Sequence, residues 1–165
     1  MAQVANAVST TVAGRLGAPT GLPACLAAIA SRDNIGLAEI GTGQVLAQNI
    51  AAELAERSAG VQYPVFYVYC EKLKNNQREK FRTFSGKAGM AVEVRVSRDR
   101  LEDLGRLVEL YAEAVTNVLD VQRGNWGGGM YYTGGYEVVF GGVKHGGKNF
   151  IQSARVTFEV DVSIG

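Results

Sequence analysis

The chain has 165 residues, of which 47% are hydrophobic and 20% are charged, and its formal net charge is +1. This length and composition predict one globular domain of the soluble class with a buried core. Two isolated cysteines, Cys25 and Cys70, and a single histidine exclude a disulfide framework and a cysteine–histidine zinc site.

The N-terminal part, residues 1–41, is rich in Ala and Gly, and we expect short helices in it. Residues 2–13 suit one helix, and Pro23 suits the first turn of a second that ends near Ser31. The apolar run 22–30 is too short to span a membrane. Residues 42–165 are expected to form a single α+β domain.

A further helix is predicted over residues 43–58. Leu46, Ile50 and Leu54 recur at the i, i+4 spacing of one helical face. Thr42 can cap its start, and Gly60 lies just past its end.

Two strands follow. The segment "PVFYVYCEKL" begins at Pro64 and is rich in β-branched and aromatic residues, which is typical of a strand. Both of its faces are apolar, so we expect cover on both sides, from the fold itself or from a neighbouring subunit. The segment "MAVEVRVS", residues 90–97, alternates apolar and other residues, which predicts a half-buried antiparallel strand.

The basic segment 71–88 lies between these strands and is expected to form a long hairpin arm. Its cations outnumber its two acidic residues and are interleaved with Phe81 and Phe84. Such a mixture fits contact with nucleic acid, but a solvated hairpin is favoured because the chain as a whole is nearly neutral. The cations that would face DNA are Lys72, Lys74, Arg78, Lys80, Arg82 and Lys87.

The strongest helix signal covers residues 100–121. Asp99 and Glu102 make a plausible capping box. One continuous apolar stripe is predicted to pack against the sheet: Leu101, Leu104, Val108, Tyr111, Val115, Val118 and Leu119. Glu102, Glu109 and Glu113 are interpreted as a solvated face with salt bridges, not as a catalytic cluster.

Aromatic residues crowd the glycine-rich segment that starts at Gly124. They are Trp126, Tyr131, Tyr132 and Tyr136, together with Met130. Two interpretations remain open: an interface with another protein, where Tyr, Trp and Met are enriched, or a small core beneath the loop. Strands are predicted over residues 136–140 and 150–164.

The stretch "GGVKHGGKN", residues 141–149, fits most of the phosphate-binding pattern G-x-x-x-x-G-K-[ST]. Asn149 replaces the hydroxyl that would bind magnesium, and the residues behind it favour a strand where a phosphate loop requires a helix. Paired glycines suit hairpin connections. We therefore expect a hairpin turn that displays Lys144, His145 and Lys148, and no nucleotide site.

Together these elements predict an α+β fold: an antiparallel sheet of about four strands, helices on one face, and the projecting arm. Catalytic residues, a cofactor and a metal are not expected, because no residue pattern supplies their chemistry.

The second half of the sequence also resembles a known family. The segments "RTFSGKAGMAVEVRVSRDRLEDLGRLVELYAEAVTNVLD" and "RGNWGGGMYYTGGYEVVFGGVKHGGKNFIQSARVTFEVDV" resemble neck and tail-completion proteins of tailed bacteriophages, most of all the tail terminators. The resemblance covers about residues 64–163 and rests on the order and character of the segments.

That resemblance implies a non-enzymatic virion protein with a mixed α/β fold, assembled in the host cytoplasm. Members form rings, commonly hexamers, that cap the tail tube and join it to the head connector, and DNA passes through the ring. A head-completion or connector adaptor is the alternative within the same group, and a nucleic-acid-binding module is the alternative outside it.

A ring subunit needs two different surfaces that fit each other. The candidate contact residues come from the strand after Pro64, the arm and the glycine-rich segment. They are Tyr67, Tyr69, Phe81, Phe84, Trp126, Met130, Tyr131, Tyr132, Lys144 and His145.

Overall fold

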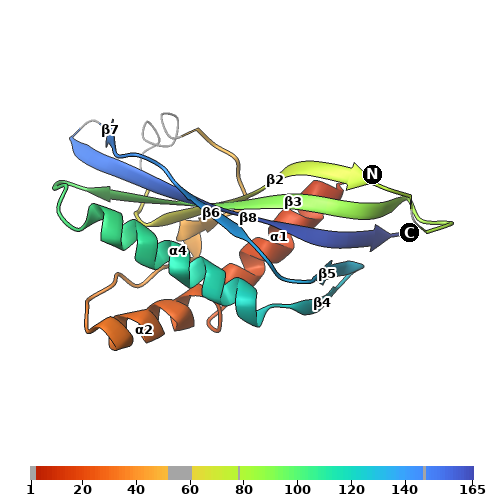
Figure 1. Cartoon of the computed structure of the whole chain (residues 1–165), viewed down its shortest axis with the longest axis horizontal. Helices are drawn as coiled ribbons and strands as arrows, with labels where there is room; N and C mark the ends of the chain where they lie inside the picture. Colours follow the sequence, from red (N-terminus) through yellow and green to blue (C-terminus); the bar gives the residue numbers. More distant parts are fainter. Residues whose placement is uncertain (1–2, 52–60, 78, 147) are drawn as a thin grey trace.

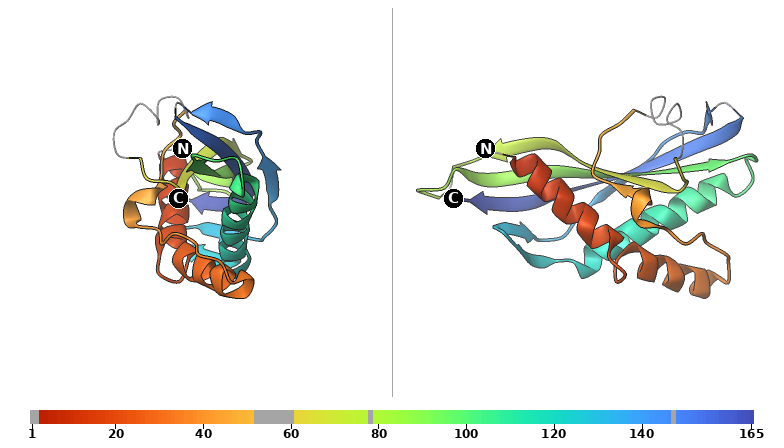
Figure 2. Two further views of the ribbon diagram at one scale, coloured as in Figure 1. Left: turned by 90° about the vertical axis from the view of Figure 1, so that its left-hand side faces the viewer. Right: turned by 180° about the vertical axis from the view of Figure 1, so that it is seen from behind.

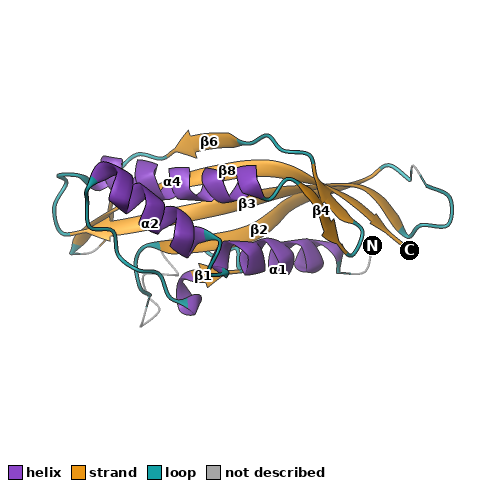
Figure 3. Cartoon of the chain, turned by 90° about the horizontal axis from the view of Figure 1, so that it is seen from below, coloured by secondary structure: helices purple, strands orange, loops and turns teal. Residues whose placement is uncertain are grey.

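The computed structural model describes residues 3–51, 61–77, 79–146 and 148–165. In this part of the chain three α-helices pack on one face of a long twisted sheet (Figures 1 and 3). The helices are α1 (Val4–Gly17), α2 (Leu22–Asp33) and α4 (Leu104–Val121). We call the sheet face away from these helices the open face.

The described strands form one eight-stranded sheet. They are β1 (Val45–Leu46), β2 (Val65–Asn75), β3 (Phe84–Arg98), β4 (Gly124–Gly127), β5 (Met130–Tyr132), β6 (Glu137–Phe140), β7 (Lys144–Gly146) and β8 (Asn149–Ile164). The central strand is β8, which pairs along one side with β3 and along the other with β5, β6 and β7. All pairs are antiparallel except β1 with β2.

The expected α+β class is compatible with this mixed architecture, but the expected sheet of four antiparallel strands is wrong. The additional strands β1, β4, β5 and β7 have only two to four residues each. Strands so short do not complete enough alternations to be recognised in a sequence. The parallel pairing of β1 with β2 also depends on contacts distant in the chain.

The central elements confirm the apolar faces that their sequence patterns predicted, but the expectation that residues 90–97 form a half-buried strand is wrong, because Ala91 and Arg95 on the other face are buried too. In β3 the side chains of Met90, Val92, Val94 and Val96 are buried in the core shared with the helices. In α4 the apolar stripe from Leu104 to Leu119 is buried in the same core, whereas Leu101 precedes the helix and is 58% exposed. The stripe thus fixes which face of α4 packs on the sheet.

The predicted capping box at the start of α4 is wrong. Residues 99–103 form bends and turns, and the helix begins at Leu104. Asp103 is the N-cap residue with φ of 62°, and its side chain makes no capping hydrogen bond. Asp99 and Glu102 therefore lie outside the helix that they were expected to start.

The helix predicted over residues 43–58 is wrong where the structure describes it. Residues 42–44 form a 3₁₀ turn, Val45 and Leu46 form β1, and residues 47–51 are irregular. Residues 52–58 lie outside the described part. Leu46 and Ile50 are four apart, which places two residues on one face of a helix and equally on one face of a strand.

The N-terminal helices confirm the expected short helices. Val4, Val8, Val12 and Leu16 of α1 are buried in the same core as the sheet and α4. Within the described residues no single helix has the length and hydropathy of a membrane span, although α1 and α2, bent by 41° relative to each other, meet those two criteria as a pair.

The first part of β2 is covered on both faces, as its apolar sequence predicted. Phe66 and Val68 lie in the core beneath the helices. On the open face, Val65 and Tyr67 form a second cluster with Leu46, Ile50, Val61 and Tyr63. The cover on the open face therefore includes residues of this chain.

The basic arm is the hairpin between β2 and β3, and most of it belongs to the sheet. Lys74 pairs with Lys87, and β8 pairs with β3 as far as Phe84 and Ile164. Only the described residues of the connection, 76–77 and 79–83, project beyond the strands, at the right-hand end of Figure 1. The predicted arm is thus confirmed as a hairpin but is shorter than expected.

Candidate subunit-contact surfaces

The glycine-rich stretch 141–149 forms a hairpin, as predicted. Lys144 pairs with Ile151 and Gly146 pairs with Asn149, so a strand follows the loop. A helix N-terminus, which supplies the partial positive charge of a phosphate loop, does not occupy the chain behind Lys148. Lys144, His145 and Lys148 are exposed, and the His145 ring meets the ring of Phe150 edge-on at 5.5 Å.

The described residues contain few side chains that are placed to bind a metal or to act as a nucleophile. No group of three or more His, Cys, Asp or Glu side chains is placed to hold a metal ion there. Cys25 and Cys70 are free thiols, and burial raises the pKa of each. Such thiols are mainly protonated at neutral pH and are poor nucleophiles.

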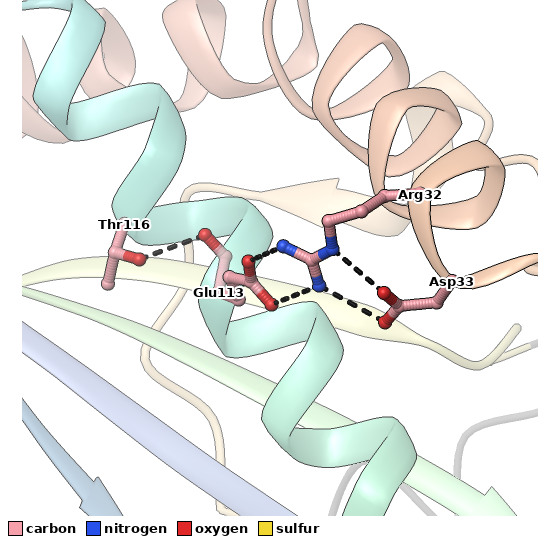
Figure 4. Close-up of polar contacts among 4 residues, drawn as sticks. All are labelled: Arg32, Asp33, Glu113 and Thr116. Atoms are coloured by element: carbon pink, nitrogen blue, oxygen red, sulfur yellow. Dashed lines mark hydrogen bonds and ion pairs between the residues drawn. The ribbon is translucent and has the colours of Figure 1, made fainter.

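One carboxylate of α4 joins two helices. Arg32 at the end of α2 donates to both carboxylate oxygens of Glu113, one of them (Nη2 to Oε2) at 3.1 Å, and its Nε donates to Asp33 Oδ1 at 2.8 Å (Figure 4). The hydrogen bond from Arg32 lowers the pKa of Asp33. Arg32 is half-exposed, so this network positions α2 on α4 and adds little to stability.

The aromatic residues of the glycine-rich segment form a small core. The Tyr132 ring lies between Trp126 and Phe158, with its centroid 5.5 Å from each. The Trp126 indole N–H donates to the Gln122 carbonyl at 2.6 Å, and the Arg15 guanidinium lies 5.0 Å from a Trp126 ring centroid. For Trp126, Met130 and Tyr132 the structure therefore favours the small-core interpretation.

Burial also shifts the pKa of the Tyr132 phenol strongly. Its hydroxyl donates to the Gly135 carbonyl at 3.0 Å, and the residue is 1% exposed. Burial, with a smaller contribution from the Asp120 carboxylate, raises the pKa of Tyr132 to about 12. The ring is thus held as a neutral core residue.

The predicted contact residues separate into buried and exposed sets. Tyr67, Phe84, Met130 and Tyr132 are buried within the chain, so they have almost no surface to offer a partner. Tyr69 and Trp126 are half-buried. Phe81 is 95% exposed and Tyr131 is 49% exposed.

The exposed set is not gathered in one place. Phe81 lies in the hairpin connection at one end of the sheet, whereas β7, which carries Lys144 and His145, lies towards the other end (Figure 1). A ring subunit needs separate surfaces, and this separation is compatible with that requirement.

One exposed surface was recognised only in part from the sequence, which singled out Tyr136 but not the other three residues. It comprises Tyr136, Val139, Phe140 and Val143, which are 42%, 52%, 51% and 45% exposed. We call these four residues the apolar edge, because β6 pairs with β8 on one side and with no other described strand. The signal was present in "YEVVF", where apolar residues occupy both faces of a short strand.

The other edge of the sheet differs in character. From Val68 to Asn75, β2 pairs with β3 and, in the described part of the chain, with no second strand. This edge carries the exposed cations Lys72 and Lys74. Lysines on an edge strand oppose pairing between two copies of that same edge.

The basic arm is partly neutralised. Lys87 lies 3.2 Å from Glu159 and 3.5 Å from Asp161, and Arg82 lies 3.3 Å from Glu79. The hydrogen bond to Glu159, followed by the charge of Asp161, raises the pKa of Lys87. Lys72, Lys74 and Lys80 are exposed, and Arg78 lies outside the described residues.

A scan against protein-family models found no match to this sequence, and a search of curated proteins also found none.

Proposed function

We propose that this chain is a structural virion protein of a tailed phage, a tail terminator that forms a ring at the head–tail junction. In this role it caps the tail tube, joins it to the head connector, and surrounds the path of the DNA. The proposal starts from the resemblance of residues 64–163 to that family, and the mixed α/β fold is compatible with it.

The observation that carries the proposal is the difference between the two edges of the sheet. The β6 edge offers four exposed apolar side chains and a strand with one described partner. The β2 edge offers a longer strand that bears lysines. Two unlike surfaces on one subunit suit a heterologous contact, which closes into a ring when the rotation per subunit divides a full turn.

Pairing of β6 with the β2 edge of a neighbour is favoured over pairing of like edges. Two β2 edges would bring Lys72 and Lys74 against their own copies, and like charges on neighbouring strands repel. The β6 edge carries the exposed Glu137, so its charge complements that of the lysines. The contact would also cover the half-exposed side chains of the apolar edge.

The experiment measures the assembly of the full chain by native mass spectrometry and electron microscopy. We expect rings from the unmodified chain. The double change Val139→Lys and Phe140→Lys is expected to give monomers with an almost unchanged melting temperature, because both side chains are about half exposed. A matched control is Val121→Lys, which adds a charge at a 77% exposed apolar residue at the end of α4 and should leave rings intact.

A chain that stays monomeric at concentrations typical of virion assembly would contradict the proposal. The alternative role as a connector adaptor predicts the same edges, and the position of the ring distinguishes the two roles. A terminator binds the end of purified tail tubes, whereas an adaptor binds the portal side in their absence. Electron microscopy of each mixture gives the answer.

A further inference from the structure

The connection between β2 and β3 presents one aromatic side chain to solvent. Phe81 is 95% exposed, and its φ of 69° lies in the left-handed region. A bulky residue with that backbone conformation is an outlier whose strain costs about 1–3 kcal/mol. A phenyl ring held in this way is almost fully available to a partner.

The base of the connection is fixed by hydrogen bonds. Asn75 Oδ1 accepts from the backbone N–H groups of Gln77 and Ser85, each at 3.1 Å. The Thr83 N–H donates to the Ile164 carbonyl at 2.9 Å, and Ser163 Oγ donates to Glu79 Oε2 at 2.9 Å. Phe81 is therefore carried by a connection that is tied to the end of β8, which lowers the entropy lost on docking.

A pocket of about 320 Å³ lies on the opposite end of the molecule. Leu26, Ala27 and Ala30 of α2 line one side, and Leu37 and Ile40 line the other. Its volume suffices for one phenyl ring, and its lining residues other than Glu39 have apolar side chains. Glu39 is the charged residue among those that line it.

The hairpin tip and this pocket cannot meet within one molecule. The connection after β2 projects at the right-hand end of Figure 1, and α2 lies at the lower left; the reversed view in Figure 2 shows the same separation. The tip also carries two cations beside Phe81, Lys80 and Arg82. Of these, Arg82 is paired with Glu79, and Lys80 is exposed.

We infer that Phe81 of one copy inserts into the α2 pocket of the next copy, with Lys80 beside Glu39. The inference rests on the proposed function in one respect, namely that the chain associates with itself. It makes each of the two surfaces the partner of the other. The phenyl ring of Phe81 supplies the apolar anchor that is typical of the centre of a contact, and the Lys80–Glu39 pair lies at the rim of that contact. Because the two surfaces are different, the contact is heterologous.

Photo-crosslinking tests the location of the contact. A benzophenone amino acid replaces Phe81 in the full chain, and unlabelled protein is mixed with ¹⁵N-labelled protein before irradiation. We expect crosslinked peptides of mixed isotope content that join position 81 to residues 22–40. Crosslinks to any other region, or to a different protein only, would overturn the inference.

Substitutions test its energetics. Phe81→Ala and Phe81→Gly are each expected to raise the dissociation constant of self-association at least about tenfold. Phe81→Gly should also raise the melting temperature, because glycine adopts positive φ without strain. Ala27→Trp fills the pocket from an exposed position and should weaken association to a similar extent. Leu101→Ala, which truncates a 58% exposed side chain elsewhere, is the control and should have no effect.

A charge exchange tests the pairing of copies. Lys80→Glu and Glu39→Lys should each weaken self-association about twofold to fivefold. The chain that carries both changes should associate as tightly as the unmodified chain. Failure of the double change to recover would contradict the assigned pair. Rings that persist in Phe81→Ala and Ala27→Trp would overturn the Phe81 contact and leave the ring proposal standing, whereas an unmodified chain that never associates would overturn both.

Discussion

The guanidinium of Arg95 lies over the ring of Tyr67 on the open face, with Cζ 4.5 Å from the ring centroid. The same group donates to Glu93 Oε2 and to the Ile50 carbonyl, each at 2.6 Å. Arg95 is only 5% exposed. A carboxylate, a carbonyl and an aromatic face replace part of the water around this buried guanidinium, whereas its Nη1 is buried without a hydrogen-bond partner.

Arg95→Ala is expected to lower the free energy of unfolding by about 3 kcal/mol, because it leaves Glu93 and the Tyr67 face without their partner. Arg95→Lys keeps the charge but loses the planar stacking and should cost less. Denaturant unfolding measures both. Arg155→Ala is the control, since Arg155 is 43% exposed beside Glu71 on the same face, and it should cost less than about 1 kcal/mol. Equal losses for Arg95→Ala and Arg155→Ala would contradict this account.

Arg95 also shows how far the sequence could predict the fold. The alternation of residues 90–97 assigned Arg95 to the correct face, because period 2 is local information. Its burial was not predictable, because the Ile50 carbonyl that accepts its hydrogen bond lies in an irregular segment that was expected to be helical. The α4 stripe and the long strand β8 were predictable for the same local reason, whereas β5 and β7 gain their pairing from β8.

The candidate contact residues also show that local patterns were predictable and that burial or exposure set by long-range contacts was not. The glycine pairs made the hairpin recognisable, but Lys144 and His145, which were expected on its turn, lie in its first strand, β7. Val139 and Phe140 were not expected at an exposed edge, because exposure of an apolar strand depends on which strands lie beside it. Tyr67 and Phe84 were expected to contact a partner, but the open-face cluster and Arg95 cover Tyr67, and Phe84 lies in the main core.

Gly129→Ala is expected to destabilise the chain by about 3 kcal/mol or more. At this position φ is 82°, and an added Cβ would lie 2.0 Å from the Ser163 carbonyl oxygen. The Gly129 carbonyl accepts from the Ser163 N–H at 2.8 Å, so the backbone cannot move away without losing that bond. The strain and the overlap therefore add.

The neighbouring glycine is a matched control for this prediction. Gly128 also has a positive φ, 61°, but an added Cβ would meet open space. Gly128→Ala should therefore cost only about 1–2 kcal/mol, the strain of the left-handed conformation. Thermal unfolding of the two variants compares them, and a loss at Gly128 as large as that at Gly129 would show that close approach is not the cause.

Tyr132→Phe is expected to change the stability of the chain at high pH. The folded pKa of Tyr132 is raised to about 12, above the ordinary value of about 10. Between these values the unfolded chain loses the proton first, so the free energy of unfolding falls as pH rises from about 10 to about 12. Phenylalanine cannot ionise, so the variant lacks the part of the fall that Tyr132 causes and keeps the part from Tyr69 and Tyr111, whose pKa values burial also raises.

Near neutral pH the same change should cost about 1 kcal/mol, because it removes the hydrogen bond to the Gly135 carbonyl. The difference in the free energy of unfolding between the unmodified chain and Tyr132→Phe should therefore become smaller as pH increases past about 10. Urea unfolding at several pH values measures it. Tyr131→Phe, at a 49% exposed position, should keep the decrease in the free energy of unfolding at high pH. If that variant loses the decrease, Tyr131 and not Tyr132 causes it.

Lys72 and Lys74 test contact of the unassembled chain with DNA, because in the proposed ring the β2 edge that carries them is covered by the β6 edge of a neighbour. Both are exposed on the β2 edge, and each phosphate contact contributes about 0.9 to the slope of log affinity against log salt. If these two lysines contact phosphates, replacing both by Ala should reduce that slope by about 1.8 in a titration with duplex DNA. Lys87→Ala is the control, because Glu159 and Asp161 already neutralise Lys87. An equal reduction in the control would mean that net charge, and not these two positions, determines binding, and no binding at low salt would remove DNA contact from the proposed role.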